Sequence, residues 1–147
     1  MEKSLERILT EFKSFATKHK QISSYSDEII TEYIAKNWIY PIMWVDYSGM
    51  GVSPAPGNVS LSIPVYFLDR VKKDQSNLAT VMSSNLIKAL QFITQYNDNE
   101  CTYGFYFTDT PSIAPEILQF DDIVSGWRLT VSLNVGYSRN ELLTPLA

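Results

Sequence analysis

The sequence offers few side chains that could act as a nucleophile or a base. His19 is the only histidine and Cys101 the only cysteine among the 147 residues. His19 lies between lysines at the end of a predicted helix, where a solvated cation is the simpler interpretation. Cys101 begins an alternating segment and is interpreted as a small buried side chain, although a catalytic pair with His19 stays an alternative. One thiol and one imidazole cannot form a four-ligand zinc site within one chain.

Paired carboxylates could serve as acid and base or hold a divalent cation. Asp121 and Asp122 are the best such pair, but neighbouring side chains of an extended segment point apart, which favours a charged turn. Residues 97–100, NDNE, lack the glycine and the distant glutamate of a calcium loop. Residues 48–51, SGMG, lack the lysine of a phosphate-binding loop. We therefore predict no enzymatic activity and no cofactor or metal, with a small hydrolase using Asp121, Asp122 or Cys101 as an alternative.

Charge and hydropathy argue against nucleic-acid binding, secretion and a membrane-spanning helix. The net charge is −4, and no run of basic residues is longer than Lys72-Lys73, so we expect no direct binding to a nucleic-acid backbone. The N-terminus carries charges throughout its first turns and does not resemble a secretory signal. The uncharged segment 47–68 is interrupted by Gly, Pro, Ser and Asn and predicts no membrane helix. A soluble protein made inside the cell is expected.

Aromatic content points towards contacts with other proteins. The chain has nine Tyr, seven Phe and three Trp, and charged residues make up only 19% of it, against a usual share of about 25%. Tyr and Trp are favoured at protein interfaces because each combines a large rigid apolar body with a polar tip. The composition therefore favours a domain whose surface meets neighbouring subunits.

The first half of the chain predicts a helix and a hairpin. Apolar residues recur every three or four positions over residues 4–18, which is typical of an amphipathic helix. Residues 39–47 and 59–68 are rich in β-branched and aromatic side chains and predict two strands. The Gly, Pro and Ser residues of segment 48–58 predict an exposed hairpin loop between them. Between the helix and the hairpin the sequence is ambiguous, with a short strand at 21–26 and helical turns at 27–36.

The second half predicts a long helix and two more strands. The helix is predicted from Asp74 to about Tyr96. Its expected core positions are Leu78, Met82, Leu86, Ala89, Leu90 and Ile93. Segments 101–107 and 124–137 alternate with period two and predict strands, the first with aromatic residues on both faces. Residues 108–120 predict a loop, and residues 138–147 an irregular tail.

Together these elements predict a single α+β domain over residues 1–147. A mainly antiparallel β-sheet with a long hairpin packs against the N-terminal helix and one long central helix. Pro64 predicts that the strand 59–68 lies at an edge or contains a bulge, since proline cannot donate to a β-ladder.

Surface features are the remaining candidates for function. They are the Gly/Pro-rich loop, the second faces of the strands and the charged residues after the hairpin. The predicted subunit-interface residues are Ser48, Gly49, Met50, Gly51, Val52, Pro54, Pro56, Tyr66, Asp69, Arg70, Tyr106 and Arg128.

The order of elements resembles the tail-completion and tail-terminator class of phage connector proteins. The resemblance is carried by the Tyr40-Pro41 strand entry, the hairpin ending in Leu68-Asp69-Arg70, and the Gly126-Trp127 strand. More narrowly, the segments IYPIMWVDYSG, SLSIPVYFLDRVKKDQSNLATVMSSN and DDIVSGWRLTVSLNV resemble structural neck or tail proteins of crAss-like phages infecting gut Bacteroidales. The resemblance covers roughly residues 40–135.

The resemblance implies a structural virion protein, assembled in the host bacterial cytoplasm. Proteins of this class form six- or twelve-fold rings stacked with portal, connector or tail proteins, and DNA passes through their lumen. Residues 48–58 would then form an arm between subunits or rings, and each interface in a closed ring would be heterologous. The alternative is a non-catalytic module that binds a small molecule or peptide, with residues 101–107 lining its pocket.

Overall fold

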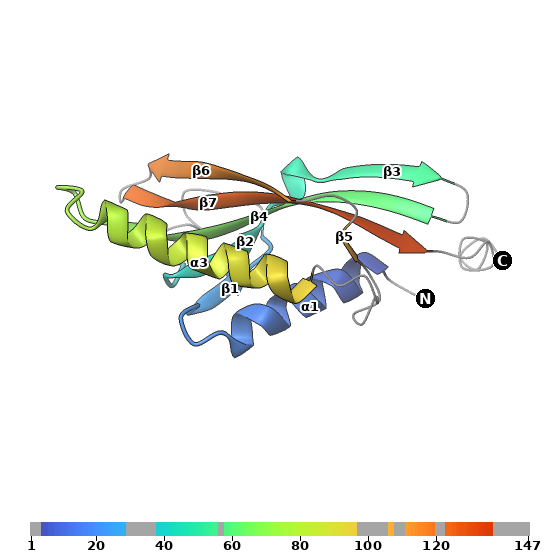
Figure 1. Ribbon diagram of the computed structural model, residues 1–147, viewed down its shortest axis with the longest axis horizontal. Coiled ribbons are helices and arrows are strands. Elements are labelled where there is room, and N and C mark those ends of the chain that lie inside the picture. Colours follow the sequence, from blue (N-terminus) through green and yellow to red (C-terminus); the bar gives the residue numbers. More distant parts are fainter. Residues whose placement is uncertain are drawn as a thin grey trace.

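The computed structural model describes residues 4–28, 38–55, 58–96, 106–107, 111–119 and 123–136. Within these ranges the helices α1 and α3 pack on one face of a seven-stranded, mainly antiparallel sheet (Figure 1). This arrangement confirms the predicted α+β fold with an N-terminal and a central helix.

The two longest strands form the centre of the sheet. β4 (Asn58–Val71) and β7 (Ile123–Gly136) are antiparallel and stay in register from one end to the other. The β4 side of this pair holds β1 (Ser24–Ser26), β2 (Ile42–Val45) and β3 (Gly51–Ala55), and the β7 side holds β5 (Tyr106–Phe107) and β6 (Ser112–Gln119). Only β1 and β2 pair in parallel among these strands.

An aromatic cluster joins the helices to the sheet. α1 (Ser4–Lys18) and α3 (Leu78–Tyr96) each contribute rings that meet above Phe67 of β4. The ring centroids of Phe12 and Phe92 lie 4.9 Å apart in an edge-to-face arrangement, which aromatic pairs prefer. Tyr96 donates its hydroxyl proton to the carbonyl of Glu11 over 2.6 Å. The predicted inward faces of strands 59–68 and 124–137 line this core.

The opposite face of the sheet carries a second apolar cluster. It is made of Trp38, Ile42, Trp44, Tyr66, Leu68 and Val124. The rings of Trp44 and Tyr66 lie 4.7 Å apart. The period-two alternation of β2 and β4 therefore buries side chains on both faces at this end of the sheet.

Segment 48–58 is not the loop that its composition predicted. Residues Tyr47–Gly49 form a short 3₁₀ helix, η1, and Gly51–Ala55 form β3, which pairs with β4 from Ser62 to Asn58. The Asp46 carboxylate caps η1 by accepting from the backbone N–H of Ser48 at 3.0 Å. Backbone pairing with β4 outweighs the low strand propensity of Gly, Ser and Pro here.

Pro64 lies in the central strand β4 rather than in an edge strand. Proline is tolerated there because the strand next to it is interrupted at this point. β2 pairs with β4 up to Val65, and β3 resumes the pairing at Ser62. The chain turns through η1 between these points, and the carbonyl of Pro64 accepts from Asp46 N–H at 3.1 Å. In an antiparallel strand the N–H and C=O of one residue point to the same side. The N–H that Pro64 lacks would therefore have faced the break between β2 and β3.

Two further boundaries differ from the prediction. α3 begins at Leu78 instead of Asp74, because residues 72–77 form a turn in which Gln75 has a φ of 61°. Asn77 accepts from Lys72 N–H at 2.8 Å and stabilises this turn. The predicted loop 108–120 contains β6, which pairs with β7 along eight residues. The predicted helical turns at 27–36 and the tail 138–147 lie almost entirely outside the described residues.

The face that α3 turns to the sheet also differs from the prediction. Its buried residues are Val81, Asn85, Lys88, Ala89, Phe92 and Tyr96, whereas Leu90 is exposed. Trp127 donates its indole N–H to the carbonyl of Met82 at 2.8 Å and fixes this rotation of the helix. Lys88 is only 2% exposed, and its ammonium donates to Asn85 Oδ1 over 3.3 Å. Burial lowers the pKa of Lys88, and the nearby Asp69 carboxylate opposes that shift.

Replacing this buried polar pair by apolar side chains is expected to stabilise the fold. We expect the double variant Lys88→Met/Asn85→Leu to increase the free energy of unfolding at pH 7 by about 1–4 kcal/mol, because it removes a desolvated cation and the unpaired amide Nδ2 of Asn85. The difference should narrow as the pH approaches the ordinary lysine pKa of 10.5, since the folded wild type then loses the buried charge. Urea titrations check this, with exposed Lys73→Met as a control that changes stability by less than about 0.5 kcal/mol.

Gly126 marks the closest approach within the central ladder. A Cβ at this position would lie 1.8 Å from the carbonyl oxygen of Phe67, so the backbone would have to move. We expect Gly126→Ala to reduce the free energy of unfolding by about 3 kcal/mol or more. The matched control is Gly51→Ala, whose added Cβ would meet Ser62 at an ordinary 3.6 Å. Equal stabilities of the two variants in urea would contradict this account.

Candidate functional site

A pocket of about 610 Å³ opens between α1, β1 and η1. Its apolar floor comes from Leu5 and Leu9 of α1, on the face that the amphipathic spacing of this helix directs towards the sheet. The other lining residues are Glu6, Thr10, Lys13, Tyr25, Asp27 and Tyr47.

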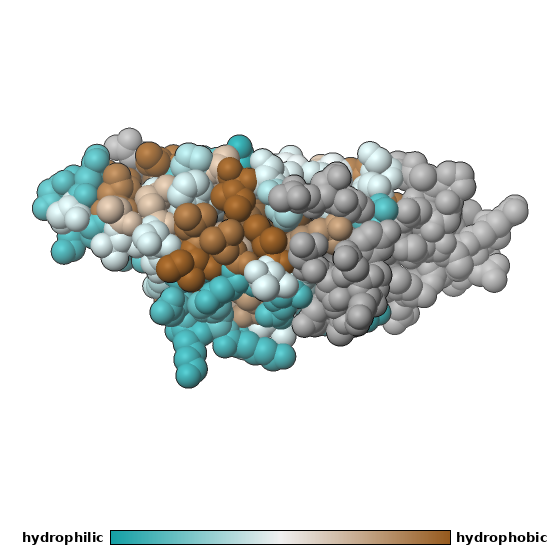
Figure 2. All heavy atoms as spheres, viewed as in Figure 1, coloured by the Kyte–Doolittle hydropathy of each residue, from teal (hydrophilic) through white to brown (hydrophobic). Residues whose placement is uncertain are grey.

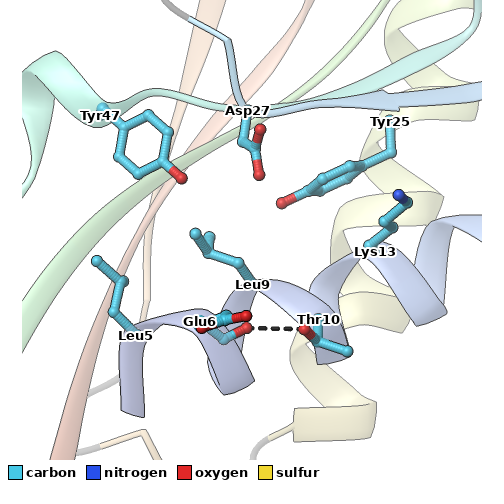
Figure 3. Close-up of a pocket in the computed structure, with 8 residues that line it drawn as sticks. All are labelled: Leu5, Glu6, Leu9, Thr10, Lys13, Tyr25, Asp27 and Tyr47. Carbon is cyan, nitrogen blue, oxygen red and sulfur yellow. Dashed lines mark hydrogen bonds between the residues drawn. The ribbon is translucent and has the colours of Figure 1, made fainter. Parts of the chain in front are cut away.

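Three polar side chains converge in this pocket, two from the β1 segment and one from η1 (Figure 3). The hydroxyls of Tyr25 and Tyr47 and the carboxylate of Asp27 point towards one another above Leu9. The Tyr25 hydroxyl is buried and forms no hydrogen bond of good geometry within the described part of the chain. Burial raises the pKa of Tyr25, with Asp27 adding to the shift, and the same two causes raise the pKa of Tyr47. Both phenols therefore stay neutral well above pH 7.

A second candidate surface is the outward face of α3. Ile87 is 51% and Leu90 48% exposed on this face. They line a shallow groove of about 370 Å³ together with Gln91, Thr94 and Gln95. Figure 2 shows apolar side chains gathered over the middle of the molecule, where Figure 1 places α3.

Charge is absent from this face. Lys88 is the one charged residue in the sequence of α3, LATVMSSNLIKALQFITQY, and its side chain is buried against the sheet. A helix with one face in water normally carries charged residues there, and the cores of protein interfaces are depleted of them. The outward face of α3 therefore resembles an interface in composition.

Several predicted interface residues are engaged within the chain. Tyr66 is only 8% exposed and packs on Trp44, and its contact with another subunit stays a prediction. Arg128 forms an ion pair with Glu116 at 3.1 Å. Arg70 lies 5.1 Å above the ring of Tyr40. The remaining charged candidate, Asp69, lies near the buried Lys88, and Tyr106 is placed only as a position of β5.

The candidates from segment 48–58 are divided between η1 and β3. Ser48 and Gly49 lie in η1, where a Cβ on Gly49 would be 2.7 Å from the Pro64 ring. Met50 packs against the core, whereas Val52 is 63% exposed on β3. Gly51 and Pro54 are also positions of β3, and Pro56 lies outside the described residues.

Of the predicted chemical residues His19, Cys101, Asp121 and Asp122, only His19 lies within the described ranges. His19 joins α1 to α3: its Nδ1 accepts from Gln21 N–H at 3.1 Å, so Nε2 carries the proton and donates to Gln91 at 2.6 Å. His19 is therefore held by hydrogen bonds on both of its ring nitrogens. Cys101, Asp121 and Asp122 lie outside the described ranges, as does most of the predicted pocket strand 101–107. Within those ranges no group of three His, Cys, Asp or Glu could hold a metal ion, and no helix could cross a membrane.

Neither the pocket between α1, β1 and η1 nor the outward face of α3 was predicted from the sequence. Tyr25 and Asp27 belong to a segment of ambiguous patterning, and their meeting with Tyr47 depends on the position of η1. The α3 surface was missed because Leu90 was assigned to the core. The near absence of charge in residues 78–96 was the signal that could have indicated it.

Alkaline pH is expected to destabilise the fold partly through Tyr25. Because burial raises its folded-state pKa above the ordinary value of 10.0, the unfolded chain loses the phenol proton first, and stability falls as the pH rises above 10. We expect Tyr25→Phe to show a smaller loss of unfolding free energy between pH 9.5 and 11, measured by urea titration. An unchanged slope would show that the Tyr25 hydroxyl is not buried as described.

Two comparisons with known proteins, against family models and curated sequences, gave no match for this chain. Evidence for a function therefore comes from the chain's own residues and contacts.

Proposed function

We propose that this protein is a non-catalytic structural subunit that assembles through the outward face of α3 into a ring. The proposed setting is the neck or tail of a tailed phage, as the sequence resemblance implies. In this proposal the protein belongs to the virion, and DNA meets it only by passing through the lumen of the ring. The partners are further copies of the chain and the neighbouring portal, connector or tail proteins.

The observation that carries this proposal is the uncharged outward face of α3. Two copies of a chain with a net charge of −4 repel each other wherever carboxylates meet. The exposed apolar residues Ile87 and Leu90, with the amides and hydroxyl of the same groove, can be buried without desolvating a charge. A surface of this kind suits contact with a copy of the same acidic chain.

The free edges of the sheet favour contact through faces instead of strand pairing. β3 and β6 have no second partner strand within the described ranges, and each contains a proline, Pro54 and Pro115. Proline is tolerated in edge strands when its missing N–H faces away from the ladder. Each edge therefore lacks a donor that an added strand would need, which opposes extension of the sheet.

The hairpin of β3 and β4 supports a heterologous interface. In Figure 1 this hairpin extends beyond the end of α3, towards one end of the long axis of the molecule. The hairpin and the α3 face are different surfaces, and a ring needs a contact between unlike patches. We propose that the hairpin of one copy lies near the α3 face of the next.

Charge placed on α3 is expected to prevent assembly. At concentrations where the wild type forms a defined oligomer by multi-angle light scattering, we expect Ile87→Lys and Leu90→Lys each to weaken every subunit contact at least about tenfold, because burial of about half a large apolar side chain is lost. Negative-stain micrographs of the wild type should show particles with a central hole.

The matched control is Ile39→Lys, which places the same charge at an exposed isoleucine outside α3. This variant should assemble like the wild type, and circular dichroism should show all variants folded. A wild type that stays monomeric at every concentration, alone and with neighbouring virion proteins, would overturn the proposal. Unchanged assembly of the Ile87→Lys/Leu90→Lys double variant would overturn the role of α3.

A ligand-binding module is the second candidate function, and the pocket between α1, β1 and η1 favours it. The pocket volume of about 610 Å³ lies within the range of small-molecule sites. Its lining is different from the one expected from the sequence, residues 101–107. The two candidate functions use separate surfaces and can be tested separately.

A further inference from the structure

We propose that the pocket between α1, β1 and η1 binds an organic cation, an ammonium or guanidinium group carried on an apolar stem. This inference does not depend on ring assembly, because the pocket and the outward face of α3 share no residue.

The charge of the pocket selects a cation. Within the described ranges no lysine or arginine forms an ion pair with the Asp27 carboxylate. Glu6 adds a second carboxylate to the lining, and Lys13 is the one basic residue there. Figure 3 shows the Lys13 side chain beside the Tyr25 ring, on the side away from Asp27. An anion would be repelled by the Asp27 carboxylate, whereas a cation would be attracted to it.

The hydrogen-bonding groups fit the same ligand. An ammonium brings three N–H donors and a guanidinium brings five, and neither accepts a hydrogen bond. The Asp27 carboxylate and the oxygens of Tyr25 and Tyr47 offer acceptors that point to one place from three sides. The Tyr25 hydroxyl is buried beside Asp27, and its oxygen has no donor within the described ranges, so it can accept from the ligand. The two aromatic rings add attraction for a cation that lies against their faces.

The floor of the pocket selects the stem. Leu5 and Leu9 offer an apolar surface below the polar groups. A bare metal ion would leave this surface unused, and no group of three metal-ligating side chains exists within the described ranges. A chain of several methylene groups ending in a cation would cover the leucines and place its charge at Asp27.

Binding of three probes of equal stem length tests the charge preference. Hexylammonium, 1-hexanol and hexanoate would be titrated into ¹⁵N-labelled wild-type protein, and dissociation constants taken from the shifts of amide signals of α1 and β1. We expect hexylammonium to bind at least tenfold tighter than 1-hexanol, and hexanoate not to bind. Equal affinity for hexylammonium and 1-hexanol, or no binding of hexylammonium at millimolar concentration, would overturn the proposal.

Two isosteric variants test the named groups. Asp27→Asn removes the charge and should reduce hexylammonium affinity at least tenfold while leaving 1-hexanol affinity unchanged. Tyr47→Phe removes an exposed hydroxyl at little risk to folding and should reduce hexylammonium affinity about threefold. The control is Asp74→Asn, which makes the same change in net charge at the exposed turn before α3 and should bind like the wild type. Equal losses in Asp27→Asn and Asp74→Asn would overturn the site.

A further experiment distinguishes a free alkylamine from a lysine or arginine side chain of a protein partner. Nα-acetyl-lysine amide presents the ammonium as a protein side chain does. Affinity equal to that of hexylammonium supports a lysine or arginine of a protein partner. Affinity at least tenfold weaker supports a free alkylamine. Ring assembly measured in the same samples is expected to be unaffected by hexylammonium, so a failure of one proposal is distinguishable from a failure of the other.

Discussion

The pairing of β4 with β7 is the constraint on which the rest of the fold depends. These strands remain in register over fourteen residue pairs, and every other strand of the sheet except β1 hydrogen-bonds to one of them. Because the side-chain period of a strand is two, this single register decides which side chains face the helices. It places Phe67 below the rings of α1 and α3, and Tyr66 on the opposite face beside Trp44. A slip by one residue would exchange the two clusters.

The same ladder positions both candidate surfaces. Trp127 of β7 holds α3 by its hydrogen bond to Met82, and that contact sets which side of the helix faces outward. The outward side is uncharged and exposes Ile87 and Leu90 among neutral polar residues, while the sheet side contains the buried Lys88 and Asn85. On the other flank, the break between β2 and β3 at Pro64 makes room for η1, and η1 brings Tyr47 to the pocket. The break in strand pairing thus creates the pocket, and the Trp127 hydrogen bond sets the outward face of α3.

The fold was largely predictable from the sequence, because long strands and helices leave strong periodic patterns. The helix over residues 4–18, the strand 59–68 and the final strand appear where their alternation predicted them. The β3 strand did not, because Gly, Ser and Pro adopt a strand only when a long neighbour offers its hydrogen-bonding groups. The face of α3 was mispredicted since both of its sides are apolar, and helical periodicity cannot choose between them. The convergence of Tyr25, Asp27 and Tyr47 depends on tertiary contacts that no local pattern records.

The prolines of the two outer strands have a consequence for the life of the unassembled chain. Because Pro54 and Pro115 each remove a backbone donor, β3 and β6 are poorer templates for cross-β pairing when many copies accumulate at high concentration. Contacts made by side chains alone form and dissociate readily until several act together. A wrongly placed copy can then leave again, whereas one joined by a continuous backbone ladder would be trapped.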